Sequence, residues 1–162
     1  MYKLWNDECK FPNVDEMKNI EDIKYVDVHT AVEGEYQFLL GAAIIKFKNK
    51  MYASWGNSYR KENDDNTILA EKSSIDMGKT WTDYRKISMT DEGFGRSHGV
   101  YFEYDGNLYA FCPKAKYDKI DAYPELKMEA YKLDEQDEWL CLGVVLEEDF
   151  WPMCQPVILD DG

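Results

Sequence analysis

The chain has 162 residues and a net charge of −13, with 32 acidic residues against 19 Lys and Arg. This length predicts one domain, and the negative charge argues against a general binder of nucleic acids or anionic membranes, because both need the opposite sign. Aromatic residues make up 15% of the sequence, including 12 Tyr and 5 Trp, which favours β-rich structure or a surface on which sugar rings stack.

The N-terminal segment, residues 1–35, predicts one strand at 24–30. It lacks an apolar h-region, so we expect no signal peptide, and no apolar run approaches the roughly 20 residues of a membrane span. As written, the chain is expected in the cytoplasm; secretion or a periplasmic location stays open if its natural start differs. No C-x-x-C pair occurs, so free thiols are preferred over a zinc or redox motif, and a disulfide stays open. The cysteines are Cys9, Cys112, Cys141 and Cys154.

Two stretches of the chain, 36–88 and 97–146, resemble each other. GAAIIKFKNKMYASW from Gly41 and GVYFEYDGNLYAFC from Gly99 each give an apolar run, a polar turn and a second apolar run. The Asp-Gly turn in the second stretch is a strong hairpin signal. Third strands are expected at 67–70 and 126–131, and fourth strands after Trp81 and Trp139. Because both the glycines and the tryptophans recur after 58 residues, the pattern is typical of β-propeller blades.

The predicted fold is therefore all-β, with two complete blades of four antiparallel strands and the start of a third at 156–162. A closed propeller needs about four to eight blades. The chain is therefore expected to be part of a longer protein, or to complete itself with further copies. Uncovered blade edges predict self-association.

The sequence SIDMGKTW lies between the third and fourth strands of the first blade and reads as a shaped turn. Asp76 can accept hydrogen bonds from backbone amides that follow it, and Gly78 permits a backbone shape that a side chain would hinder. Ser74 and Thr80 offer hydroxyl groups, and the ring of Trp81 can anchor the next strand. These residues are expected to hold the fold rather than to act in chemistry.

The longer loops, 57–66, 90–97, 113–124 and 147–155, are predicted to share the opposite end of the blades, where sites commonly sit. Each candidate there has a structural alternative: backbone hydrogen bonding for the histidine, capping for the acids, salt bridges for the arginines and packing for the tryptophan. His98 is expected near the central axis, because it begins an innermost strand. The candidates are His98, Asp64 and Asp65 for catalysis, and Arg60, Arg96 and Trp151 for substrate binding.

The SIDMGKTW turn resembles the Asp box, S-x-D-x-G-x-T-W, of the sialidase-like propellers. Together with FLLGAAI, MYASWGN, RSHGV and FWPMCQPVILDDG, it makes residues 36–162 similar to the BNR-repeat, exo-α-sialidase-like proteins of bacteria. The resemblance implies the N-terminal part of a six- or seven-bladed propeller acting on an acidic or decorated glycan. It places Asp64 or Asp65 near the acid/base Asp of sialidases. The chain departs from the family where FLLG stands in place of the F/Y-R-I-P motif.

Two classes of function follow. In a glycoside hydrolase, Asp64 or Asp65 would supply one of two carboxyl groups, His98 would transfer a proton, and Arg60 and Arg96 would hold a sugar carboxylate. The second carboxyl group would lie in further blades, so this chain alone is expected to be inactive. The alternatives are a non-catalytic propeller that binds glycans or proteins, and a propeller polysaccharide lyase. The expected partner is a carbohydrate, with no cofactor and no metal.

Overall fold

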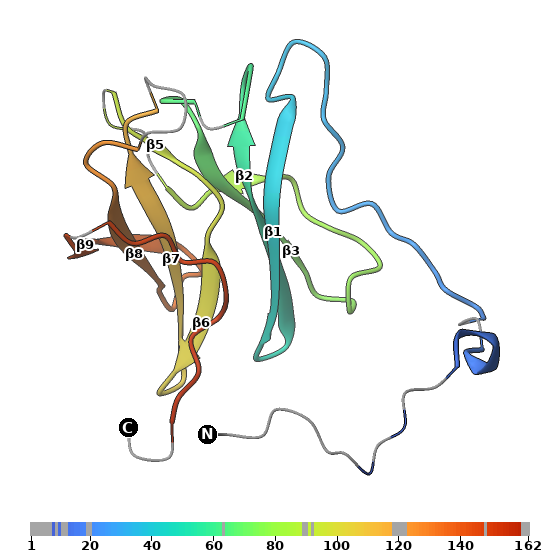
Figure 1. The fold of residues 1–162 in the computed structure, drawn as a ribbon. Helices are drawn as coiled ribbons and strands as arrows, with labels where there is room; N and C mark the ends of the chain where they lie inside the picture. The colour runs from blue at the N-terminus through green and yellow to red at the C-terminus, as the bar shows by residue number, and fades with distance from the viewer. Residues whose placement is uncertain are drawn as a thin grey trace.

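The computed structural model describes Glu8, Lys10 and residues 13–18, 21–62, 64–88, 91, 93–117, 123–147 and 149–159. Apart from one 3-10 turn at Val14–Glu16, its regular elements are β-strands. They form two antiparallel sheets that stand side by side (Figure 1). The all-β prediction is confirmed. None of the described segments is a helix long and apolar enough to cross a membrane.

The first sheet has the order β1-β2-β3-β4. Its strands are β1 (Phe38–Phe47), β2 (Lys50–Ser58), β3 (Ile68–Ser74) and β4 (Arg85–Lys86). The turn between β1 and β2 is tight, with Lys48 at a positive φ of 53°, and Phe47 pairs with Lys50 across it. This sheet is the meander predicted for 36–88, although β4 is only two residues long.

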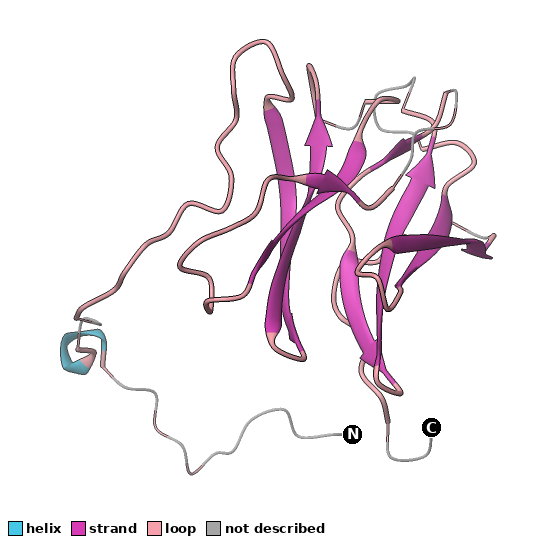
Figure 2. Cartoon of the chain, turned by 180° about the vertical axis from the view of Figure 1, so that it is seen from behind, coloured by secondary structure: helices cyan, strands magenta, loops and turns pink. Residues whose placement is uncertain are grey.

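The second sheet contains β5 (Gly95–Arg96), β6 (Val100–Tyr104), β7 (Asn107–Ala115), β8 (Lys127–Leu133) and β9 (Trp139–Leu146). Both β5 and β6 pair with β7, so they act as one interrupted strand and the sheet is again a four-membered meander. Asp105 and Gly106 make the β6–β7 turn with φ values of 47° and 69°. The two sheets are thus blade-like and do not close into a ring (Figure 2).

Two predicted terminal strands are absent from the structure. Residues 24–30 form no strand, and 156–159 form none either, while 160–162 lie outside the described residues. The N-terminal stretch instead packs its side chains on a face of the first sheet. Val28 and Tyr36 lie against the cluster of Trp55, Ile68 and Ala70. A strand needs a free sheet edge for its backbone, and this packing offers the segment a face rather than an edge.

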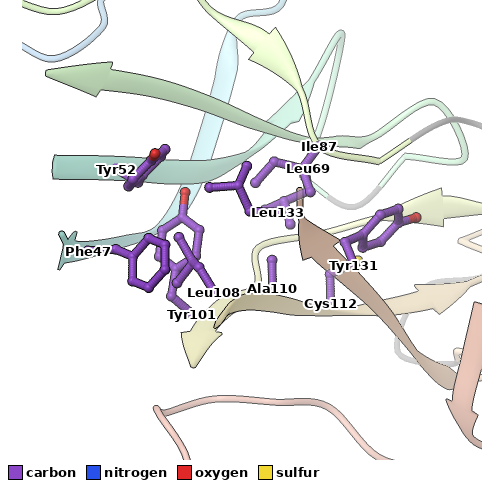
Figure 3. Packing of buried hydrophobic residues seen from close by; sticks show 10 residues of the cluster. All are labelled: Phe47, Tyr52, Leu69, Ile87, Tyr101, Leu108, Ala110, Cys112, Tyr131 and Leu133. Atoms are coloured by element: carbon purple, nitrogen blue, oxygen red, sulfur yellow. The ribbon is translucent and has the colours of Figure 1, made fainter. Parts of the chain in front are cut away.

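The main core lies between the two sheets. Phe47, Tyr52 and Leu69 from the first sheet meet residues of β6, β7 and β8 (Figure 3). The second-sheet members are Tyr101, Leu108, Ala110, Cys112, Tyr131 and Leu133. Leu69, Tyr101 and Leu108 are each at most 1% exposed. This apolar contact fixes the two blades against each other, since burial of such side chains is the main favourable term in folding.

A buried carboxylate joins the sheets beside this core. Glu71 on β3 has no exposed surface. It accepts hydrogen bonds from Arg85 Nε at 2.8 Å, Tyr101 Oη at 2.8 Å and Trp139 Nε1 at 3.0 Å. Tyr101 and Trp139 belong to the second sheet, so this one side chain bridges both blades. Burial raises the pKa of Glu71, and the charge of Arg85 opposes that shift.

Candidate functional site

The long links between strands gather at one end of the sheets, and the tight turns after β1 and β6 lie at the other end (Figure 1). At the loop end the two blades touch directly. The Tyr117 amide donates a hydrogen bond of 2.6 Å to Asp65 Oδ1. Gly95 lies so close to the neighbouring loop that a Cβ there would stand 2.3 Å from the Asp64 carbonyl oxygen. The loop end is therefore a joint surface of both sheets.

His98 lies between β5 and β6 and is half-buried. Its ring packs on Gly41 of β1 so closely that a Cβ at Gly41 would lie 2.1 Å from His98 Cγ. Burial lowers the pKa of His98, and the charge of Glu62 works in the opposite direction. The imidazole is thus neutral near pH 7 and able to accept a proton.

An open cavity adjoins His98 on the side that faces β1. Its volume is about 410 Å³, and its walls are 41–44 of β1, 98–101, and the C-terminal segment 153–155. β1 and β6 are the innermost strands of their sheets in the blade order, so this cavity lies where the sequence predicts the central axis. A ligand group entering from the axis would meet the imidazole of His98.

Trp151 packs beside His98 at the loop end, and Tyr117 and Tyr123 pack against Trp151. The centroid of Trp151 lies 5.6 Å from that of His98, 6.3 Å from that of Tyr117 and 5.1 Å from that of Tyr123. The buried Trp151 Nε1 has no hydrogen-bond partner among the described residues. We call His98, Tyr117, Tyr123 and Trp151 the aromatic cluster. The faces of aromatic rings suit the faces of sugar rings.

The two candidate catalytic acids hold the loop in shape. Asp64 Oδ1 accepts hydrogen bonds from the backbone amide of Asn66 at 3.1 Å and from its side chain at 3.2 Å. Asp65 Oδ1 accepts the hydrogen bond from the Tyr117 amide. Neither carboxylate contacts His98 in any hydrogen bond found among the described residues. A role in proton transfer would require one of them to leave these bonds.

The two candidate arginines have different surroundings. Arg60 is exposed, stacks on Tyr59 with 5.8 Å to the ring centroid, and borders an open depression with Tyr36, Asp64 and Asn66. Arg60 is therefore placed to meet a ligand at the outer rim of the loop end.

Arg96 is only 2% exposed and its guanidinium is occupied. It donates two hydrogen bonds to the Glu129 carboxylate, from Nε to Oε2 at 2.9 Å and from Nη2 to Oε1 at 3.0 Å. Nη2 also donates to Asp91 Oδ2 at 2.9 Å. Burial opposes its charge, and the bonds to Glu129 and Asp91 overcome that effect and raise the pKa of Arg96. A substrate contact would have to displace this ion pair, so the geometry favours the salt-bridge alternative.

Tyr117 and Tyr123 are members of the aromatic cluster that sequence reasoning did not single out. The available signal was the pair of tyrosines in the loop 113–124, but loop position alone does not show which rings converge. Among the described residues, no group of three His, Cys, Asp or Glu side chains is placed to hold a metal ion. Cys112, Cys141 and Cys154 are free thiols, and Cys9 lies outside the described residues.

The SIDMGKTW turn is held by hydrogen bonds within itself. Asp76 accepts from the Thr80 amide at 2.9 Å, from Thr80 Oγ1 at 2.6 Å and from Ser74 Oγ at 2.8 Å. Ser74 Oγ accepts from the Gly78 amide at 2.9 Å, and Trp81 Nε1 donates to the Gly78 carbonyl at 3.1 Å. Hydrogen bonds from Thr80 and Ser74 lower the pKa of Asp76 to about 2. These contacts are structural.

Replacing Asp76 with Ala is expected to loosen this turn without disturbing the loop end. The Thr80 amide would lose its acceptor, so its hydrogen exchange should quicken roughly tenfold, the loss of about one hydrogen bond. Exchange measured by NMR on Asp76→Ala and on the isosteric Asp76→Asn tests this. Unchanged protection at Thr80, or a shift of His98 resonances, would contradict it.

Comparisons with known proteins give solved structures that resemble this chain in part. No family model matches the chain, and no curated protein matches it significantly. A mutant of Trypanosoma rangeli sialidase displaying trans-sialidase activity aligns at 13% identity and a TM-score of 0.49, covering 70% of this chain and 20% of the sialidase. Trypanosoma rangeli sialidase in complex with sialic acid aligns at 12% identity and a TM-score of 0.49, covering 64% and 18%. The aligned part is thus about a fifth of each sialidase.

Proposed function

We propose that the loop end binds carbohydrate, as part of a sialidase-like propeller glycoside hydrolase acting on acidic or decorated glycans. The observation that carries this proposal is the aromatic cluster: Trp151 packs on the half-buried His98, and Tyr117 and Tyr123 pack on Trp151. His98 also lines the axis-facing cavity. The rings would stack on sugar faces. Arg60, at the rim, would attract an acidic substituent.

In this hydrolase His98 is the proton-transfer group. Its lowered pKa keeps the imidazole neutral, which is the form that accepts a proton from water or a sugar hydroxyl. Hydrolysis also needs two carboxyl groups across the glycosidic bond. Asp64 and Asp65 are engaged in loop hydrogen bonds, so we assign them to shaping the site. The reacting carboxyl groups would then come from other blades.

A second candidate, glycan binding without turnover, is favoured by one specific observation. Asp65 and Arg96, both candidates for chemistry, make bonds that hold the two sheets together or stabilise the second sheet. Binding without turnover needs only groups that contact a sugar, such as the ring of Trp151 and the exposed Arg60 at the rim. Catalysis and binding are separated by asking whether bound oligosaccharide is cleaved.

Replacing Trp151 with Ala is expected to weaken oligosaccharide binding roughly three- to tenfold, the contribution of one aromatic contact. The measurement is an NMR titration of the chain with acidic and neutral oligosaccharides. Ile75→Ala is the matched control, because Ile75 is exposed in the SIDMGKTW turn at a distance from the site. Binding that is unaffected by Trp151→Ala would overturn the proposed site. Cleavage is tested in a longer protein that carries the further blades: cleavage that depends on His98 would favour the hydrolase, and binding without cleavage there would favour the second candidate.

A further inference from the structure

The second sheet has an apolar face turned away from the first sheet. We call it the outer flank of the second sheet and define it by Phe102, Tyr104, Tyr109, Phe111 and Leu140. Its rings stack on one another, with centroids 5.9 Å apart for Phe102 and Tyr104 and 6.5 Å apart for Tyr109 and Phe111, and Lys132 Nζ lies over the Tyr109 ring. Tyr104 is 53% exposed and Leu140 51%. Contiguous exposed apolar surface of this kind marks an interaction site.

The positions of the first sheet that correspond in register to this flank are buried against the second sheet. Phe102 pairs with Tyr109 across its hairpin as Ile45 pairs with Tyr52. Tyr104 ends its strand before the turn as Phe47 does. Ile45, Phe47 and Tyr52 all pack in the core between the sheets. The outer flank of the second sheet therefore repeats the pattern with which the first sheet docks on its neighbour.

The first sheet carries the complementary pattern on its own far face. In the core, Tyr101, Leu108 and Ala110 of the second sheet receive the docking residues (Figure 3). Ile44, Met51 and Ala53 occupy the equivalent positions on β1 and β2, since Ile44 pairs with Ala53 as Tyr101 pairs with Ala110. With Trp55, these residues define the outer flank of the first sheet.

This second flank is open at Ile44, whereas Gly78 of the SIDMGKTW turn lies beside Met51, where a Cβ on Gly78 would stand 3.6 Å from Met51 Sδ. Ile44 is 56% exposed, and an open, mostly apolar cavity of about 380 Å³ lies beside it, walled by 39–44, 53–55 and His29. His29 stacks on Trp55 at 4.9 Å between centroids, so the N-terminal segment covers the other end of the flank. Open apolar space for a side chain thus remains beside Ile44.

We propose that the outer flank of the second sheet binds the outer flank of the first sheet of a second copy of this chain. The contact continues the interface that the two sheets already make within one chain. Tyr104 then lies against Ile44 and Met51 of the second copy, as Phe47 lies against Tyr101 and Leu108. Because the two flanks differ, the contact is head-to-tail and repeats from copy to copy until it closes or extends.

Single-flank variants test the proposal. The wild-type chain is expected to give oligomers in sedimentation velocity, with mean mass rising with concentration. Tyr104→Lys and Ile44→Glu should each give monomers. An equimolar mixture of the two variants should give dimers, because each retains the flank that the other has lost. Glu103→Lys, at an exposed position outside the two flanks, is the control that should assemble as wild type does.

Circular dichroism and thermal melts of every variant show whether it is folded, and the mixing result is independent of small stability changes. A wild-type chain that stays monomeric at all concentrations would overturn the proposal. So would a mixture that stays monomeric. Disruption by Tyr104→Lys but not by Ile44→Glu would show that the flank of the second sheet pairs with itself instead, which also overturns it.

Discussion

Replacing Glu71 with Ala is expected to lower the free energy of unfolding by about 3–5 kcal/mol, the cost of removing one partner from a buried ion pair. The change removes the closest carboxylate from the Arg85 guanidinium, whose remaining carboxylate partner, Asp137, lies 3.8 Å away. It also removes the acceptor for Tyr101 Oη and Trp139 Nε1, which come from the other sheet. Unpaired polar groups in such a site lose their partners without regaining water. Urea denaturation followed by tryptophan fluorescence measures the effect.

The matched control for this prediction is Glu71→Gln, which has nearly the same shape and retains one acceptor oxygen. Its cost should be smaller than that of Glu71→Ala, because some of the donors keep a partner. The double variant Glu71→Gln with Arg85→Met removes the unpaired charge and should recover part of the loss. If Glu71→Ala unfolds at the wild-type urea concentration, the bridge between the sheets contributes nothing to stability, and the prediction is wrong.

The strand order of both sheets could be predicted from the sequence because local signals specify it. The turns at Lys48 and at Asp105-Gly106 lie between runs whose apolar side chains alternate, and this fixes the register of each hairpin. The strand expected at 24–30 is wrong: its composition suits a strand, but Val28 packs on a sheet face while Tyr25 is 86% exposed and Val26 50%. The composition of a segment shows that it favours a strand, and it does not show whether a sheet edge is free to pair with that segment.

The site was harder to predict because it depends on convergence between distant loops. The position of His98 at the start of a strand followed from strand order. The packing of Tyr117 and Tyr123 on Trp151 could not be predicted, since their loop has no periodic pattern that orients its side chains. Arg96 also shows this limit. Its sequence neighbours suggest a loop-end cation, whereas its partner Glu129 lies on β8, 33 residues away.

Replacing Arg96 with Met is the second change expected to have a large effect, again about 3–5 kcal/mol of unfolding free energy, because Glu129 would stay buried and lose both bonds to Arg96, with Lys114 Nζ left at 3.7 Å. Glu129 is 4% exposed and also accepts a hydrogen bond from Tyr131. The exposed Arg60 is the matched control, and Arg60→Met should change stability by less than about 0.5 kcal/mol. Chemical denaturation of both variants at pH 7 gives the comparison.

Acid titration adds a second readout of the Arg96 cluster. Hydrogen bonds from Lys114 and Arg96 lower the pKa of Asp91 to about 2, from an ordinary value of 3.8. Although burial opposes it, Arg96 also lowers the pKa of Glu129 below its ordinary 4.5. Both groups stabilise the fold above these ordinary values and lose that contribution as the pH falls through the folded ones. Wild-type stability should therefore decline below about pH 4, and this decline should be shallower in Arg96→Met.

A substrate-binding role for Arg96 would give a different pattern from a structural one. A structural role predicts that Arg96→Met with Glu129→Gln recovers much of the lost stability, because the buried charge is gone and Tyr131 keeps an acceptor. It also predicts that oligosaccharide binding by this double variant matches that of wild type once both are folded. An Arg96→Met chain with wild-type stability and no binding of acidic oligosaccharides would instead place Arg96 in the ligand site.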